Sequence, residues 1–202
     1  MSDYPPEPWD LRGQLHASAF LVPSTDVPAE FPPGCRPVRI GKRCIVGTAW
    51  VEYEPGGVLD YRELMATVLV RRGWRLMPTI ARIWVDSERS RDGGRALWGI
   101  PKELASFEFD DGRLVVWDDS GGIATGTVRR RVTLPRRWPV AFSLVQWLDG
   151  AAKISPVHST ASLALSSTTF DPDPAGPLGF LVGRRPWVSF SLCDFRMSFG
   201  RG

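Results

Sequence analysis

Short apolar runs and alternating segments occupy most of this chain. The runs at 44–53, 75–86 and 187–193 are rich in Val, Ile, Trp and Phe, and turn-forming residues flank them. Segments 125–132 and 159–167 alternate polar and apolar residues with a period of two. Both patterns are typical of β-strands separated by turns. We therefore predict strands over these five segments.

Three other segments need individual interpretation. Residues 60–70 fit either a helix, from the spacing of their apolar positions, or a strand, from their β-branched end. Asp110-Asp111-Gly112-Arg113 lies between two short aromatic and apolar runs and predicts a β-hairpin. Pro101 suits the first position of a helix, so the segment around Lys102 is predicted to begin as a loop and continue as a short helix or turn.

No helical pattern follows residue 110, and this favours a mainly β fold with minor helical content (α+β minor). We expect a closed or strongly curved antiparallel β-barrel with a central small-molecule cavity. Nine tryptophans and ten phenylalanines could fill its core and line such a cavity. The length of 202 residues, 43% of them hydrophobic, predicts a single domain over 1–202. The acidic, proline-rich residues 1–15 are expected to form an extended, partly ordered arm.

Composition excludes several classes of protein. The net charge is only +3, with basic and acidic residues interspersed. No 18-residue apolar stretch exists, so we expect no membrane span. Three cysteines without a Cys-x-x-Cys pair fit a reducing cytoplasm better than a disulfide framework. His16 and His158 lie far apart, so we expect no metal. Neither a phosphate-binding loop nor a dinucleotide fingerprint is present, so we expect no cofactor.

Lys102 stands out among the charged residues. Lys42, Lys102 and Lys153 are the three lysines among 25 basic residues, and Lys102 has apolar neighbours such as Trp98 and Leu104. A desolvated lysine can become a nucleophile, whereas arginine stays protonated. Lowering its pKa from about 10.4 to about 7 needs roughly 4 to 5 kcal/mol, which burial can supply. The residues alone also permit a structural alternative, in which the Lys102 stem packs on Trp98 and its head stays in water.

Two segments resemble a known family. Gly94-Arg95-Ala96-Leu97 followed by Pro101-Lys102-Glu103-Leu104 resembles the active-site segment of acetoacetate decarboxylase and its superfamily, where Gly-Arg-Glu-Leu precedes Pro-Lys-Lys-Leu. Upstream, 58–63 resembles the family segment Leu-Gly-x-Tyr-x-Glu, and 83–86 sits where the family has an apolar strand ending in Asp. The resemblance covers residues 9–110 well and the C-terminal half only by its β-rich pattern. It implies a lyase that forms a Schiff base with a small oxo-acid, for decarboxylation or for aldol or dehydration chemistry.

The resemblance also implies roles for individual residues. Lys102 would attack the substrate carbonyl and form an iminium ion, which acts as an electron sink. Glu63, at the place of the family's active-site glutamate, would transfer protons. Arg12 would pair with a substrate carboxylate or with Glu63. Trp98, four residues before Lys102, is expected to line the pocket.

Glu103 departs from the family pattern, which has a second lysine at this position. A carboxylate about 4 Å from the amine would favour the ammonium by about 4 kcal/mol at an effective dielectric constant near 20. Either Glu103 points away from the pocket, or it is protonated, or the amine of Lys102 is not activated by a lowered pKa. We name Glu103, with Arg12 and Trp98, as a candidate substrate-binding residue.

Two other classes of function stay open. A non-catalytic protein could keep the small-molecule pocket without the chemistry, as Glu103 suggests. A nucleic-acid-binding β-domain would use the aromatic residues and the arginines at 129–131 and 136–137, although solvated arginines on an exposed strand explain this run more simply. We expect a small oxo-acid as partner, no nucleic acid and no membrane. Because family members commonly are homo-oligomers, we expect one here.

Overall fold

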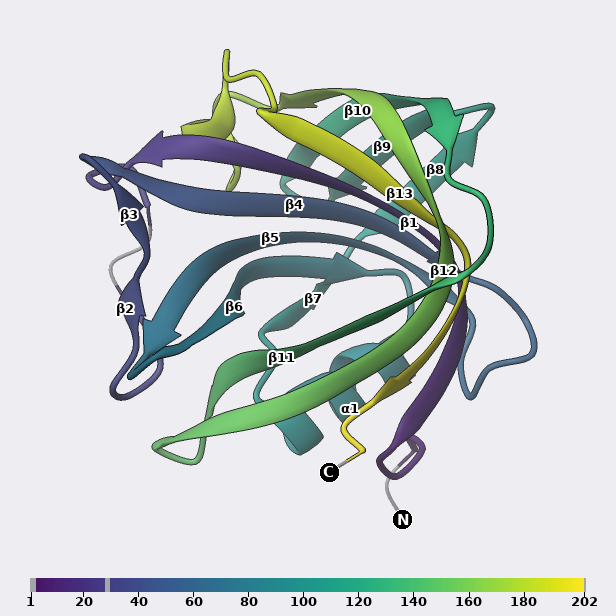
Figure 1. The fold of residues 1–202 in the computed structure, drawn as a ribbon, viewed down its shortest axis with the longest axis horizontal. Coiled ribbons are helices and arrows are strands. Elements are labelled where there is room, and N and C mark those ends of the chain that lie inside the picture. Colours follow the sequence, from purple (N-terminus) through teal and green to yellow (C-terminus); the bar gives the residue numbers. More distant parts are fainter. Residues whose placement is uncertain (1–2, 28–29, 202) are drawn as a thin grey trace.

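The computed structural model describes residues 3–27 and 30–201. Over these residues, thirteen strands form one mixed sheet, accompanied by one α-helix and one 3-10 helix (Figure 1). The elements are β1 (Trp9–Pro23), β2 (Arg36–Pro37), β3 (Arg39–Ile40), β4 (Arg43–Tyr53), β5 (Tyr61–Arg72), β6 (Arg75–Val85), α1 (Glu88–Trp98), β7 (Lys102–Leu104), β8 (Ser106–Asp110), β9 (Arg113–Asp118), β10 (Gly121–Thr133), β11 (Trp138–Leu148), β12 (Ala151–Pro172), the 3-10 helix (Gly179–Leu181) and β13 (Val188–Phe199).

The predicted strands are confirmed. The five segments named from the pattern correspond to β4, β6, β10, β12 and β13. Segment 60–70 is also a strand, β5. Its even-numbered apolar residues Leu64 and Val68 pack in one core while Met65 faces the other side, and burial on both faces produced the apparent helical spacing. Residues 9–15, expected in an N-terminal arm, form the first half of β1.

The hairpin at residues 110–113 is confirmed as well. β8 and β9 are antiparallel, with Asp110 opposite Arg113. Asp111 and Gly112 have φ values of 39° and 78°, the left-handed region that a tight two-residue hairpin turn requires at both central positions.

The sheet is open and mixed, so the predicted closed or strongly curved antiparallel barrel is wrong, although the mainly β content is confirmed. The strand order is β7-β6-β5-β4-β1-β13-β12-β10-β9-β8, which leaves β7 and β8 at opposite edges of the described sheet. β7 runs parallel to β6. A parallel neighbour needs a crossover connection, which α1 supplies. The antiparallel barrel was predicted because no helical pattern follows residue 110, and α1, which lies before that residue, was not predicted.

The segment around Lys102 also differs from the prediction, because the helix precedes Lys102 instead of following Pro101. Ser87 caps α1, its Oγ accepting a hydrogen bond from Ser90 N at 3.3 Å. Gly99 ends the helix in the left-handed conformation (φ 66°) and donates its N–H to Arg95 O. Serine at the first cap and glycine at the last are preferred residues there. Pro101 then leads into β7.

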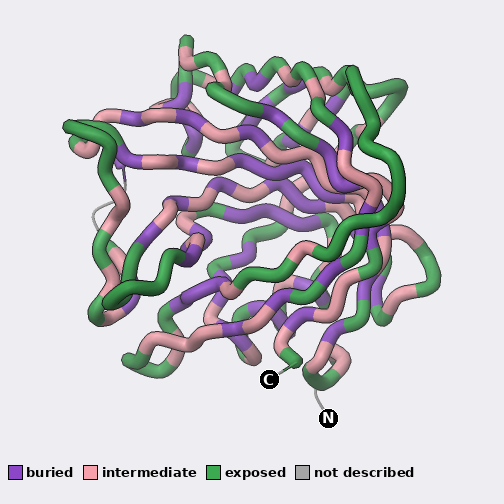
Figure 2. Tube along the Cα trace, in the orientation of Figure 1, coloured by how far each residue is buried: buried purple, intermediate pink, exposed green. Residues whose placement is uncertain are grey.

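Two apolar cores lie on opposite faces of the central strands. Along β4, Val46 and Trp50 belong to one core, whereas Ala49 and Val51 belong to the other. The first core is covered by β9 and β10, and the second by α1, β11 and β13. Figure 2 shows the resulting concentration of buried segments in the interior strands and of exposed segments in the turns. None of the helices in the described ranges has the length and hydrophobicity that crossing a membrane requires.

The side chain of Gln146 connects β11 to β6. Its Oε1 accepts hydrogen bonds from Ile80 N at 2.7 Å and Thr79 Oγ1 at 2.8 Å, and its Nε2 donates to Ile80 O at 3.2 Å. These bonds satisfy polar groups that would otherwise be buried without partners. Gln146 therefore holds β11 over the second core although, among the strands that the structure describes, β11 pairs through its backbone only with β12.

Candidate active site

The amine of Lys102 sits within a buried cluster of oxygen atoms. Lys102 begins β7, and its Nζ donates hydrogen bonds to Ser90 Oγ at 2.8 Å, Glu63 Oε2 at 2.9 Å and Tyr61 Oη at 3.2 Å. An ammonium group has three N–H donors, so all three are satisfied. Lys102 is only 3% exposed and Glu63 only 2%, which excludes bulk water from the pair.

The ionisation of this cluster follows from two opposed effects. Burial, the largest influence, disfavours the charged amine of Lys102, but attraction by the Glu63 carboxylate and the contact with Tyr61 outweigh it, so the pKa of Lys102 is raised. In the free protein the amine is therefore an ammonium ion. This differs from the lowered pKa that burial alone would give. The buried carboxylate of Glu63, at hydrogen-bonding distance, decides the direction in which the pKa of Lys102 shifts.

Adjacent strands present the acidic and phenolic groups of the cluster. Tyr61 and Glu63 are two residues apart on β5 and so project from the same face. Tyr53 on β4 lies opposite Tyr61 in the register, and its hydroxyl donates to Glu63 Oε1 at 3.3 Å. Burial is the main cause that raises the pKa values of Tyr53 and Tyr61. Both phenols therefore stay protonated and can act as hydrogen-bond donors.

Two glycines allow α1 to approach the cluster closely. A Cβ atom on Gly94 would lie 2.8 Å from Lys102 Cδ, and one on Gly93 would lie 2.5 Å from the indole ring of Trp9. Both distances are shorter than carbon atoms tolerate. The glycines thus bring Ser90 of the same helix within reach of the amine.

An apolar cavity of about 360 Å³ opens beside the Lys102–Glu63 pair. Trp98 is among its lining residues, as expected, and its indole Nε1 donates to Glu7 Oε2 at 2.9 Å. Trp9 also lines the cavity; its ring meets that of Trp98 edge to face at 4.8 Å and lies 5.9 Å from Lys102 Nζ. Aromatic rings thus form one wall beside the amine.

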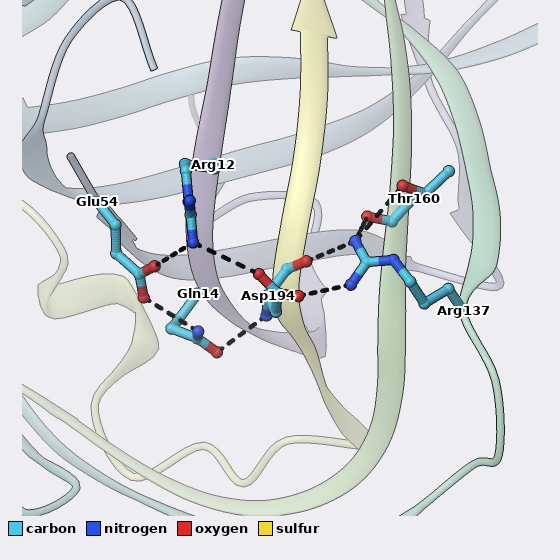
Figure 3. A network of polar contacts seen from close by, with 6 residues as sticks. All are labelled: Arg12, Gln14, Glu54, Arg137, Thr160 and Asp194. Atoms are coloured by element: carbon cyan, nitrogen blue, oxygen red, sulfur yellow. Dashed lines mark hydrogen bonds and ion pairs between the residues drawn. The ribbon is translucent and has the colours of Figure 1, made fainter. Parts of the chain in front are cut away.

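Arg12 lies outside this cavity. Its side chain is 40% exposed, and its guanidinium lies 3.8 Å from Glu54 Oε2 and 3.9 Å from Asp194 Oδ1. Figure 3 shows this network, in which Arg137 contacts Asp194 from the other side. Arg12 lines another recess, of about 550 Å³, and its contacts with Glu54 and Asp194 hold it there. The structure does not bring it to Glu63.

Glu103 also lies away from the amine. It follows Lys102 on β7, so its side chain projects from the opposite face, and it is exposed. Of the five residues named from the sequence, the structure brings Lys102, Glu63 and Trp98 together. Arg12 and Glu103 are on other surfaces.

Three polar residues of the cluster were missed from the sequence. Tyr61 had a signal, because a strand puts residues 61 and 63 on one face. Tyr53 becomes a neighbour only through the pairing of β4 with β5. Ser90 depends on α1, whose start signal was Ser87 followed by an acidic first turn.

The sequence profile of the family described as acetoacetate decarboxylase (ADC) matches residues 2–134, more than half of the chain. The chain belongs to the acetoacetate decarboxylase family. The predicted resemblance to this family is thereby confirmed. A search of curated proteins found none that matches.

Solved structures related to this family share the fold. Acetoacetate decarboxylase from Legionella pneumophila is 16% identical with a TM-score of 0.70, over 100% of this chain and 88% of that one. The enduracididine biosynthesis enzyme MppR complexed with pyruvate is 15% identical with a TM-score of 0.70, over 99% of this chain and 91% of that one. An acetoacetate decarboxylase-like enzyme from Sphingomonas wittichii is 11% identical with a TM-score of 0.65, over 96% of this chain and 91% of that one. At these identities the likeness shows the fold alone, and these neighbours are enzymes.

Proposed function

We propose that the protein is a lyase that forms a Schiff base between Lys102 and an oxo-acid and then releases carbon dioxide. The observation that carries the proposal is the buried contact of 2.9 Å between Lys102 Nζ and Glu63 Oε2, at the wall of an apolar cavity. Membership of the acetoacetate decarboxylase family supports it. The pyruvate complex of a protein with the same fold supports an oxo-acid as the ligand but not the loss of carbon dioxide, because pyruvate is a 2-oxo acid.

The first step is proton transfer within the pair. The ammonium of Lys102 passes a proton along the hydrogen bond to Glu63, which gives a neutral amine and a neutral carboxylic acid. Two separated charges in an apolar site carry a desolvation penalty that the neutral pair does not. The nucleophile therefore needs no lowered pKa in the free protein.

Nucleophilic attack and loss of water follow. The Lys102 amine adds to the substrate carbonyl and forms a carbinolamine. Protonated Glu63 lies within hydrogen-bonding distance of Nζ and gives its proton to the departing hydroxyl, so that water leaves and an iminium ion forms. Tyr61 and Ser90 accept hydrogen bonds from the amine and orient it.

Decarboxylation is the step that this environment favours over aldol cleavage. The carbon–carbon bond to the carboxylate breaks and its electron pair moves to the iminium nitrogen, giving a neutral enamine and carbon dioxide. This movement requires a 3-oxo acid, whose carboxylate is one carbon away from the iminium carbon. A positive and a negative charge disappear, and a dry apolar cavity favours this loss of charge.

Turnover then restores the free enzyme. Glu63, left without a cationic partner, takes up a proton from solvent and transfers it to the enamine carbon. Water hydrolyses the resulting iminium to a ketone and the Lys102 ammonium. The lysine itself supplies the electron sink, so the proposal includes no cofactor.

The test is the release of carbon dioxide from 3-oxobutanoate above the spontaneous rate. We expect Lys102→Arg, which keeps a cation beside Glu63 but cannot form an iminium, to abolish the catalysed part. The matched control is Lys153→Arg at a partly exposed lysine 3.8 Å from Glu7, which should retain it. Catalysis that persists in Lys102→Arg would exclude the proposed mechanism.

A further inference from the structure

The cavity beside Lys102 is larger than a short oxo-acid requires. Its volume of about 360 Å³ falls within the range of ~300–1,000 Å³ that is common for drug-sized ligands. It also extends well beyond the polar cluster, because its lining includes residues of β1, β4, β11 and β13 in addition to β5 and β7. The extra space needs an occupant.

Cross-strand pairing shows where this space lies. Two neighbouring sets of cross-strand partners matter here: the set that contains Lys102, and the next set on the same face in the direction away from Glu63. In these two sets, β1 and β4 carry four small residues. These residues, which we call the small floor, are Ala17, Ala19, Gly47 and Ala49. In the register of Glu63 the same two strands carry Leu15 and Val51 instead. The hollow therefore runs from the ion pair over the small floor, away from the larger side chains.

The hollow ends at an aromatic rim. Phe142 on β11 and Phe190 on β13 line the cavity and are 44% and 38% exposed, so they mark its opening to solvent. Along β5 the lining continues from Glu63 to Thr67, and four residues of strand span roughly 13 Å at 3.3 Å each. This is the length over which the lining follows β5.

Charge restricts what such a chain can carry. Among the described residues that line the cavity, Lys102 and Glu63 are the charged ones, and they pair with each other. A charged group over the small floor would be removed from water without a partner of opposite charge. The walls there are mostly Ala, Met, Pro, Ile and Phe side chains. Three hydroxyl residues also line this part, Ser18, Thr48 and Thr67, of which Ser18 bonds to Ser189 and Thr67 donates to Gly47 O.

We propose that the substrate is a carbonyl compound with an extended apolar tail, alkyl or arylalkyl, that lies over the small floor and reaches the Phe142–Phe190 rim. The carboxylate lost as carbon dioxide is its only charged group. The orientation of the carbonyl towards Lys102 rests on the proposed function. The tail site itself rests on the cavity.

The first measurement uses straight-chain 2-alkanones from 2-propanone to 2-dodecanone, which are neutral and cannot decarboxylate. The protein is incubated with each ketone and reduced with borohydride, and the adduct on Lys102 is quantified by mass spectrometry. We expect the half-saturating concentration to fall by about fourfold per added methylene, as burial of one methylene predicts, until the tail reaches the rim. The matching 1-alkanols, which lack a carbonyl, should raise the melting temperature with the same dependence on length.

The second measurement shortens the site. Ala17→Leu places a larger side chain on the small floor and should reduce the ratio of long-chain to short-chain adduct at least tenfold. Ala151→Leu is the matched control, because Ala151 is exposed at the start of β12 and the same change there should leave the ratio unaltered. Circular dichroism and melting temperature establish that Ala17→Leu is folded.

The outcomes separate the two proposals. Adducts that form equally well with short and long ketones, or a ratio that Ala17→Leu leaves unchanged, would overturn the apolar tail and leave the Schiff base intact. A melting temperature that rises with the chain length of the alkanol, while no ketone modifies Lys102, would support the tail site and overturn the Schiff base. A melting temperature that does not depend on the chain length of the alkanol, together with an unmodified Lys102, would overturn both proposals.

Discussion

At the scale of single residues, Lys102 and Glu63 act as one unit. Each is buried and each would be costly to bury alone, because an unpaired charge in the interior loses its hydration. Together they satisfy each other, and the proton they share can reside on either partner. The pKa of Lys102 is raised in the free protein because Glu63 outweighs burial, so the proposed mechanism obtains its neutral amine by proton transfer within the pair.

Glu63→Gln should lower the pKa of Lys102. Without the carboxylate, burial acts with less opposition, so the pKa of Lys102 should fall relative to that of the wild type. Reductive methylation of Lys102 as a function of pH, followed by mass spectrometry, measures this change. Release of carbon dioxide should nevertheless fall by about 10²- to 10⁴-fold, because the proton donor is lost.

Glu103→Gln is the matched control for this prediction. It removes a carboxylate from the neighbouring, exposed position and should alter neither the methylation profile nor the rate. An unchanged or raised pKa of Lys102 in Glu63→Gln would contradict the role given to Glu63.

The sequence predicted the two central residues but not their whole environment. Lys102 and Glu63 could be placed because each lies in a segment that resembles the family's. Tyr61 could have been added from the strand period alone. Arg12 and Glu103 were placed at the site from the sequence, but the structure directs both elsewhere. Arg12 pairs with Glu54 and Asp194. Glu103 follows Lys102 on β7, and the alternation of side chains along a strand points it to the other face.

At the scale of elements, α1 positions the active site by its closeness. Its glycines at 93 and 94 cost helix stability, about 1 kcal/mol each relative to alanine, and they obscured the helix in the sequence. In return they let Trp9 and Lys102 pack directly against the helix backbone. The helix also carries the crossover that makes β7 parallel to β6 and so fixes where Lys102 lies in the sheet.

Gly94→Ala should separate stability from activity. The new methyl would lie 2.8 Å from Lys102 Cδ and 3.0 Å from Cε, so the lysine side chain must move and its contact with Glu63 must lengthen. A displacement of about 1 Å can reduce a rate by 10²-fold, and we expect a loss of this order in carbon dioxide release. Circular dichroism should show that the fold is retained.

Asp92→Ala provides the comparison for Gly94→Ala. It adds an alanine at an exposed position of the same helix, away from Lys102, and should preserve the rate. If Gly94→Ala is as active as Asp92→Ala, the close approach of α1 does not position the amine.

At the scale of the whole molecule, the open sheet buries its central strands on both faces. The first core is dry packing between β4, β9 and β10, whereas the second encloses the cavity and the ion pair. Local periodicity predicted the strands and the hairpin at 110–113. It could not predict that β1 lies between β4 and β13, because this order depends on pairing between residues more than 170 positions apart in the chain, such as Ala17 and Phe190.

The central claim is that the amine of Lys102 becomes covalently bound to the substrate. It is tested most directly by incubating the protein with 3-oxobutanoate, reducing with borohydride and locating the adduct by peptide mass spectrometry. Our account predicts the reduced adduct on the Lys102 peptide of the wild-type protein, none on Lys42 or Lys153, and none in Lys102→Arg. Catalysed release of carbon dioxide with an unmodified Lys102, or with the adduct on another lysine, would contradict it.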